Sequence, residues 1–423
     1  MKVFSKIKAQ AMQFAILISV LVALLLGAFL LLTHVQSFFK IKSQELIQAF
    51  EQSNTLIFDT LEKTTVVSDT IVSEVGPKVI KHATSYHGTW LKTYAGVITH
   101  NRKAERIAFT GSKRTDKTPN LYLVNTNSPL VVVGNTRLEG NSYLPKQGVK
   151  AGNISGTYYQ GNNLYYGRAI ESAESLPKLE QGWIDYLKSV TSGSSIDKGI
   201  SITLEKEIKN SFHKSVQLLY DSDPIFLENE KIAGNIIIQS QTKIVVGTRA
   251  QLQDVVLIAP RIIIQDGVKG NFQSIATKTI EIGKGCYLSY PSAAVLLDQN
   301  VLHTTTQNNQ LQNAKPDFNI GSGTIIEGAI VYLKNKKSPD NRIKTHVMIA
   351  PKTEIVGEVY CEGNVDFQGT IRGSMYTRQC IARQSGSVYL NHIYNGKVLI
   401  NPVKDYAGLP FRNSKNSIAK WLY

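Results

Sequence analysis

The longest apolar run of the chain extends from Phe14 to Leu32 and contains Ser19 as its only polar side chain. As a helix rising about 1.5 Å per residue, this run is about 28 Å long, close to the thickness of the hydrocarbon core of a bilayer. It therefore predicts a transmembrane helix over residues 13–33, preceded by a short tail, residues 1–12. The side chains that we expect to face lipid are Phe14, Leu17, Leu21, Leu24, Leu25, Phe29 and Leu32.

The helical pattern continues beyond this run. No glycine or proline occurs between Val35 and Leu61, and apolar residues such as Phe50 and Ile57 recur at about helical spacing. We expect residues 34–64 to continue the same helix outside the membrane and to pack against a folded domain.

Residues 66–170 are rich in β-branched and aromatic residues with frequent glycine, and we expect a β-rich mixed domain over residues 65–230. Leu179 to Val190 is typical of a short helix, and residues 191–215 are polar enough for a surface excursion. Two interpretations of the tyrosines at 158, 159, 165 and 166 remain open, a stacking platform for sugars or the packed face of a sheet.

From residue 231 the pattern becomes periodic. Isoleucines and valines recur every 18 residues, and a second set, Val347 with Val365 and Ile349 with Phe367, keeps this period, as does Ile325 with Ile343. Such a period predicts a parallel β-helix over residues 231–400, because inward side chains of successive coils then stack in columns. The expected core columns contain Ile244, Val246, Ile262, Ile264, Ile280, Ile282, Val347 and Val365.

The alternative for this region is an antiparallel sandwich. Its hairpins would carry Asn-Gly or Asp-Gly at regular intervals, whereas only Asp266-Gly267 and Asn395-Gly396 occur. The predicted fold is therefore mainly β: a long N-terminal transmembrane helix, a β-rich middle region and a C-terminal parallel β-helix. Residues 401–423 are expected to form a cap or tail, and an uncapped end would favour polymerisation.

The charges around the apolar run predict its orientation. Lys2, Lys6 and Lys8 precede it without any acidic residue, so the positive-inside rule places the N-terminus in the cytoplasm. We expect a single-pass protein of the inner, cytoplasmic membrane whose bulk is periplasmic or otherwise extracytoplasmic. The alternative is a cleaved signal peptide, but the apolar run is longer than such peptides usually have.

Composition narrows the class of protein. The chain has 423 residues, a formal net charge of +15, 42% hydrophobic and 19% charged residues, which excludes a disordered chain. The three cysteines cannot form a disulfide framework and show no metal-binding spacing. The positive charge either attracts an anionic polymer or surface or keeps the molecule soluble. We expect no nucleic-acid partner, because aromatic residues do not interleave the basic clusters.

Motifs for catalysis are missing. No GxSxG occurs, the SxxK matches lack the partner motifs, and His82 and His87 are not spaced to share one face of a helix or strand. Asp254 and Asp266 fall in different columns of adjacent coils, so they are not expected to converge. The sequence thus predicts no catalytic residue, no cofactor and no metal.

Two family resemblances follow from these segments. The stretch from Ile355 to Gly373 resembles the bactofilins, which implies a right-handed β-helix that polymerises beside a membrane. The N-terminal helix resembles type IV pilins and the pseudopilins of type II secretion, although no glycine precedes the apolar run and no acid occurs before Glu45. The whole arrangement also resembles membrane-anchored proteins of unassigned function.

Together these features predict a non-enzymatic, membrane-anchored structural or assembly protein, such as a pilin-like or accessory subunit of a secretion or envelope machine. Its partners would be membrane lipid through the N-terminal helix, other proteins of the assembly and an anionic polymer, and it could form oligomers. The alternative is a surface β-helix protein that binds or cleaves carbohydrate.

Overall fold

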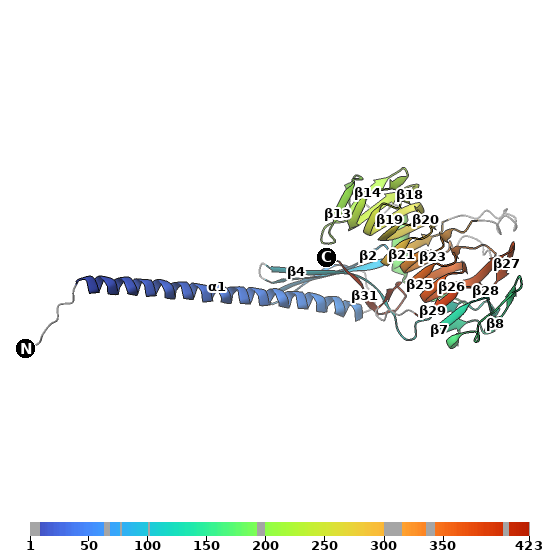
Figure 1. Cartoon of the computed structure of the whole chain (residues 1–423), viewed down its shortest axis with the longest axis horizontal. Helices are drawn as coiled ribbons and strands as arrows, with labels where there is room; N and C mark the ends of the chain where they lie inside the picture. The colour runs from blue at the N-terminus through green and yellow to red at the C-terminus, as the bar shows by residue number, and fades with distance from the viewer. Residues whose placement is uncertain are drawn as a thin grey trace, which may run out of the picture. The chain divides into compact units, whose positions relative to one another are not determined.

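A computed structural model describes residues 9–62, 68–76, 78–99, 102–192, 199–299, 315–335, 343–400 and 406–422. The protein is mainly β with one long apolar N-terminal helix, as predicted (Figure 1). The lysines of the expected N-terminal tail, Lys2, Lys6 and Lys8, lie outside the described residues.

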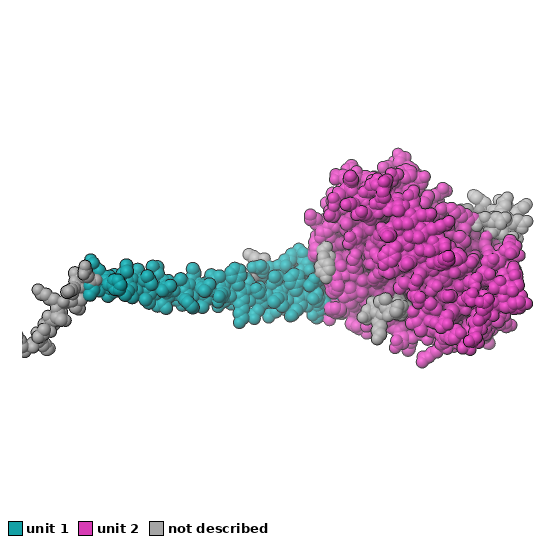
Figure 2. All heavy atoms as spheres, in the orientation of Figure 1, with its two compact units in different colours: residues 1–57, 71–82, 95–106 teal, residues 58–70, 83–94, 107–423 magenta. Residues whose placement is uncertain are grey.

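The chain forms two compact units, which Figure 2 colours separately. The first comprises residues 1–57, 71–82 and 95–106, and the second comprises residues 58–70, 83–94 and 107–423. Helix α1 (Ala9–Glu62) is a single uninterrupted helix, in agreement with the absence of glycine and proline after Val35.

An antiparallel sheet follows α1 in the order β1-β2-β3-β4-β30, and β31 also pairs with β4. Its strands are β1 (Ser68–Val75), β2 (Lys78–His87), β3 (Trp90–Thr99), β4 (Arg102–Lys113), β30 (Ala407–Gly408) and β31 (Asn416–Leu422). Successive strands are neighbours, so β1 to β4 form a meander.

The second unit is dominated by a parallel β-helix, and this prediction is confirmed. Its strands pair in parallel from one coil to the next, with a few local register shifts, and Figure 1 shows the succession from β13 through β19, β23 and β26. The coils are formed by β12 (Ile200–Ile202), β13 (Glu207–Asn210), β14 (Gln217–Asp221), β15 (Ile225–Leu227), β16 (Lys231–Gly234), β17 (Ile236–Ser240), β18 (Lys243–Val246), β19 (Gln251–Ile264), β20 (Lys269–Ile282), β21 (Tyr287–Leu297), β22 (Phe318–Ile320), β23 (Ile325–Leu333), β24 (Val347–Ile349), β25 (Glu354–Phe367) and β26 (Thr370–Gln384).

The β-helix extends beyond the expected range 231–400 at both ends. At the first end, β12 and β13 already pair with β14 and β16, so the described part of the expected surface excursion, residues 199–215, belongs to the coils. At the other end, a segment from far earlier in the chain continues the stack after β26. This segment contributes β5 (Leu121–Leu123), β7 (Arg137–Leu144) and β11 (Tyr166–Glu171). Strand β29 (Lys397–Leu399) pairs with β26 and β7 in the same part of the stack.

Further small elements complete the second unit. Helix α2 (Gln181–Thr191) confirms the helix expected at Leu179 to Val190. A three-stranded parallel sheet contains β28, β6 and β8, and two antiparallel pairings join β10 to β9 and β27 to β26. These strands are β6 (Leu130–Val133), β8 (Val149–Ala151), β9 (Asn153–Ile154), β10 (Thr157–Tyr158), β27 (Ser387–Leu390) and β28 (His392–Tyr394).

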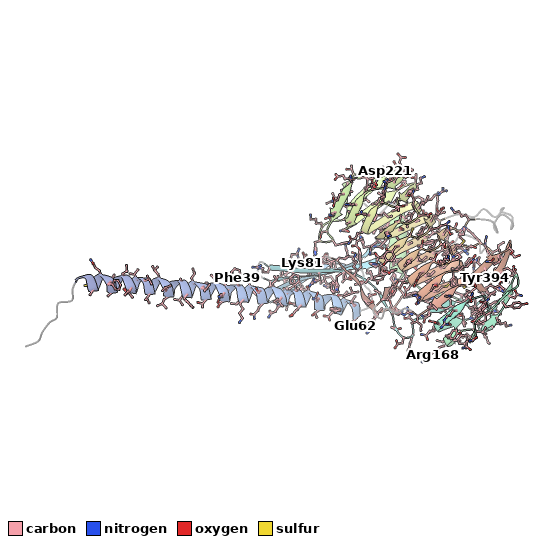
Figure 3. All side chains as sticks on the ribbon, viewed as in Figure 1. Phe39, Glu62, Lys81, Arg168, Asp221 and Tyr394 are labelled. Atoms are coloured by element: carbon pink, nitrogen blue, oxygen red, sulfur yellow. The ribbon has the colours of Figure 1, made fainter. Side chains whose placement is uncertain are left out.

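The C-terminal tail has a different place from the one expected of a cap. Its described residues, 406–422, form β30 and β31 beside β4. The last rungs are instead built from residues 121–171, and Arg168 on β11 marks this end while Asp221 on β14 marks the first coils (Figure 3). The tail pairs with β4 because residues 416–422 offer a strand to its free edge.

Candidate functional site

The first half of α1 has the surface of a lipid-facing helix. The seven side chains expected to face lipid, Phe14, Leu17, Leu21, Leu24, Leu25, Phe29 and Leu32, are each between 53% and 69% exposed. The helix is long and apolar enough to cross a membrane. Exposed apolar side chains on all sides of one helix are expected in hydrocarbon, since in water they would form an unusually large apolar patch.

The second half of α1 is different, because one of its faces packs on the sheet. Ala49 is 1% exposed and forms an apolar cluster with Val97 and Ala104. The Arg106 guanidinium lies 5.0 Å from the centre of the Phe50 ring, and Lys78 Nζ donates a hydrogen bond of 3.1 Å to the side chain of Gln52. One continuous helix therefore carries an apolar half and a half that is fixed to the β-meander.

The exposed apolar surface of α1 continues past the predicted span. Phe38 is 51% exposed, Phe39 is 63% exposed and Ile41 is 55% exposed. Phe39 is labelled on the helix in Figure 3. These side chains lie beside Lys40 and Lys42, so the exposed apolar surface extends into the first positively charged part of the helix after the predicted span.

The predicted core columns are stacked inside the β-helix. Ile244 pairs with Ile262 and Ile262 with Ile280, and Val246, Ile264 and Ile282 form the neighbouring column. The first column continues through Phe318 to Val347 and Val365. All these side chains are 0–2% exposed. These side chains fill the interior of the solenoid, so no internal channel exists at these positions.

One expected pair of the repeat was wrong. Ile325 pairs with Tyr287 and Glu354, whereas Ile343 lies outside the strands. The chain between Leu333 and Val347 is an insertion within this coil, so 18 residues do not bring it back to the same position.

The four tyrosines that suggested a platform do not form one. Tyr158 on β10 is 68% exposed, Tyr159 packs partly against the core, and Tyr166 lies under Arg137, whose guanidinium is 4.5 Å from the ring centre. Tyr165 is 38% exposed. Neither of the two interpretations, a flat sugar platform or one packed face, describes this arrangement.

The histidine and the cysteines with shifted pKa values are buried residues. Burial lowers the pKa of His87 to about 3, aided by Lys92, and the imidazole stacks on Phe109 with ring centres 5.4 Å apart. His82 is half-buried on β2. Burial also raises the pKa of the thiols of Cys286, Cys361 and Cys380. The raised thiol pKa values make these cysteines poor nucleophiles, and His87 is buried in the packing, where a ligand from solvent cannot reach it.

Glu358 is a buried acid with a raised pKa and a hydrogen bond to the C-terminal segment. Burial raises its pKa to about 7, and its carboxylate accepts a 2.6 Å hydrogen bond from the backbone N–H of Leu409 in the C-terminal segment. Tyr406 in the same segment donates to the carbonyl of Gly328. Glu358 therefore fixes the C-terminal segment to the β-helix.

Among the residues that the structure describes, no group of three or more His, Cys, Asp or Glu side chains could hold a metal ion. Asp254 and Asp266 do not converge. Asp254 forms an ion pair with Lys420, and Asp266 accepts from the backbone N–H of Lys284.

A hollow with basic walls lies on the first coils and is named here the basic groove. Its volume is about 750 Å³, and its charged and amide lining residues include Lys209, Lys231, Lys269, Lys420, Gln251 and Gln253, together with one acid, Glu207. Parallel pairing brings Glu207 beside Lys231 and Lys231 beside Gln251. The 18-residue period of the sequence marks the inward columns, whereas the groove is formed by outward side chains, which that period does not single out.

Comparisons with known proteins give one weak similarity. No protein-family model and no curated protein matches the chain. Among solved structures, it is similar to the competence-associated pilin ComZ from Thermus thermophilus, with 8% identity and a TM-score of 0.23 over 89% of this chain and 97% of that one. Two structures with so low a score need not share a fold, so the function proposed below rests on the chain's own architecture.

Proposed function

We propose that this chain is a membrane-anchored, pilin-like structural subunit of an envelope or secretion assembly and that it performs no catalysis. In this proposal the apolar half of α1 spans the inner membrane with its N-terminus in the cytoplasm. The β-helix then lies on the extracytoplasmic side as a rigid head.

The observation that carries the proposal is the division of α1. Phe14 to Leu32 is enough to cross a bilayer, yet Phe38, Phe39 and Ile41 remain exposed beyond it. Leaving such side chains in water costs free energy that another apolar helix would recover. The first half of α1 is apolar and the second half is fixed to the β-meander. Such a helix suits lateral assembly of subunits in and just above a membrane.

The head supports a structural role. The buried columns of the β-helix hold one backbone arrangement over many coils, and the strongly perturbed groups, Glu358 and His87, are engaged in packing. Perturbed pKa values point to catalysis when such groups converge in a cleft. These two do not, which favours a scaffold over an enzyme.

A photo-crosslinking experiment tests the assembly role. Phe39 would be replaced by a photoreactive phenylalanine analogue in the full-length chain in its native membrane. We expect light-dependent adducts with at least one other protein. The matched control carries the same analogue at Tyr158, which is equally exposed but lies on the head.

Adducts formed with lipid alone from position 39, in a chain that stays in the membrane, would contradict the assembly role. The carbohydrate-binding alternative is favoured by a specific feature, the basic groove, which the next subsection considers separately from α1.

A further inference from the structure

We propose that the basic groove binds a linear acidic polysaccharide. The groove belongs entirely to the β-helix unit, so this inference does not rest on the proposed role of α1.

The coils place Lys231 and Lys269 on the outer surface of β16 and β20. Neighbouring rungs of a parallel sheet are about 4.8 Å apart, so outward side chains at equivalent positions form a ladder along the axis. Lys231 on β16 is followed by Gln251 on β19 and, one coil further, by Lys269 at the start of β20. All three side chains are exposed. A linear polymer lying along the axis would therefore meet two positive charges, Lys231 and Lys269, two rungs apart.

The charge in the groove is only partly offset by neighbouring carboxylates. Lys209 pairs with Glu207 at 2.7 Å, but both side chains are more than half exposed, and such surface pairs are weak. Lys420 is held by Asp254 at 2.6 Å and forms a wall of the groove. The hydrogen bond from Lys209 and, to a smaller extent, the charge of Lys231 lower the pKa of the Glu207 carboxyl. In the described part of the chain, however, neither Lys231 nor Lys269 forms a direct ion pair. Their ammonium groups can therefore meet carboxylates of a ligand.

The remaining lining favours sugars over nucleic acid. Gln251 and Gln253 present amides, which donate to and accept from hydroxyl groups. Single-stranded nucleic acid is usually held by exposed aromatic rings on which bases stack. The aromatic residue here, Tyr290, donates its hydroxyl to the carbonyl of Ala407 and packs against Trp90. Its ring is thus engaged in the fold.

The test uses the full-length chain in nanodiscs of neutral phosphatidylcholine, so that lipid charge does not interfere. Fluorescent polygalacturonate is titrated at low and high salt, with dextran and poly-dT as the neutral and nucleic-acid probes. We expect salt-sensitive binding of polygalacturonate, no binding of dextran, and weaker binding of poly-dT.

The variant Lys231→Gln/Lys269→Gln should weaken polygalacturonate binding about tenfold. The control variant Lys146→Gln/Lys150→Gln removes the same charge from exposed lysines at the other end of the β-helix and should change binding less than twofold. Thermal unfolding of both variants should match that of the wild type, since all four side chains are exposed.

Equal losses in both variants would overturn the groove as the site, because only net charge would then matter. Absence of polygalacturonate binding would overturn the proposal altogether, and tighter binding of poly-dT would overturn the ligand class. None of these outcomes would affect crosslinking from Phe39, so the two proposals fail separately.

Discussion

A column of glycines turns one corner of the β-helix. Gly328, Gly357 and Gly373 are paired in successive coils, and each has a φ between 144° and 148°. A Cβ on Gly357 would lie 2.0 Å from the carbonyl oxygen of Gly328, and one on Gly373 would lie 2.0 Å from that of Gly357. The backbones approach so closely that only glycine fits.

Replacing Gly357 by alanine should therefore destabilise the head strongly. The new methyl group would meet backbone of the neighbouring coil and would also impose an unfavourable φ, at a cost of about 3 kcal/mol or more. Gly323→Ala is the control, because its φ is 73° and no atom lies within 4 Å of its Cβ, so it should cost about 1 kcal/mol. Thermal unfolding of the two variants measures the difference, and equal shifts would show that the close approach is unimportant.

The buried carboxyl group of Glu358 predicts a pH dependence. Its pKa is about 7 in the folded chain against an ordinary value of 4.5, so the folded state binds more protons between these values. Stability should then fall as pH rises through this window, by about 3 kcal/mol from this group. Comparing unfolding midpoints of the wild type at pH 5 and pH 8 gives the total change.

The contribution of Glu358 is isolated by Glu358→Gln, which keeps an acceptor for the Leu409 N–H but does not titrate. The drop in midpoint between pH 5 and pH 8 should be smaller in this variant. Burial raises the pKa of Asp366 to about 6, which acts in the same direction, whereas His87 acts in the opposite one. An unchanged drop in Glu358→Gln would show that Glu358 is not responsible.

At the scale of elements, α1 is the part on which anchoring depends. The double variant Leu24→Arg/Leu25→Arg places two charges at the centre of the predicted span, at a cost of about 3 kcal/mol each. Alkaline carbonate extraction of membranes should leave the wild type and the control Leu24→Ile/Leu25→Ile in the pellet and release the arginine variant. Retention of the arginine variant would contradict a span at Phe14 to Leu32.

The sequence predicted those elements whose partners are near in the chain. The columns of Ile244, Ile262 and Ile280 were visible because one uninterrupted coil takes 18 residues. The insertion before Val347 broke this period, and the expected pairing of Ile325 with Ile343 was wrong for that reason.

The rungs at the end of the β-helix formed by residues 121–171 could not be predicted from the sequence period. Leu121 pairs with Met375, and Leu138 pairs with Val398, so these rungs join segments that are distant in sequence. No local period records such a pairing. The same limit applies to the C-terminal segment, whose link between Leu409 and Glu358 depends on tertiary packing alone.

At the scale of the whole molecule, we propose a chain that α1 anchors in the membrane and whose β-helix forms a rigid head. The three native cysteines suit a test of this arrangement, because all are buried and their raised pKa values keep them as thiols. A cysteine introduced on the head would then be the main site of labelling.

The most direct measurement is labelling of intact cells with a membrane-impermeant maleimide, using the full-length variant Tyr158→Cys. We predict that Tyr158→Cys is labelled without lysis, and that Ser5→Cys, in the segment before the predicted span, is labelled only after the membrane is opened. Labelling of Tyr158→Cys only after lysis would contradict a head displayed outside the cytoplasm.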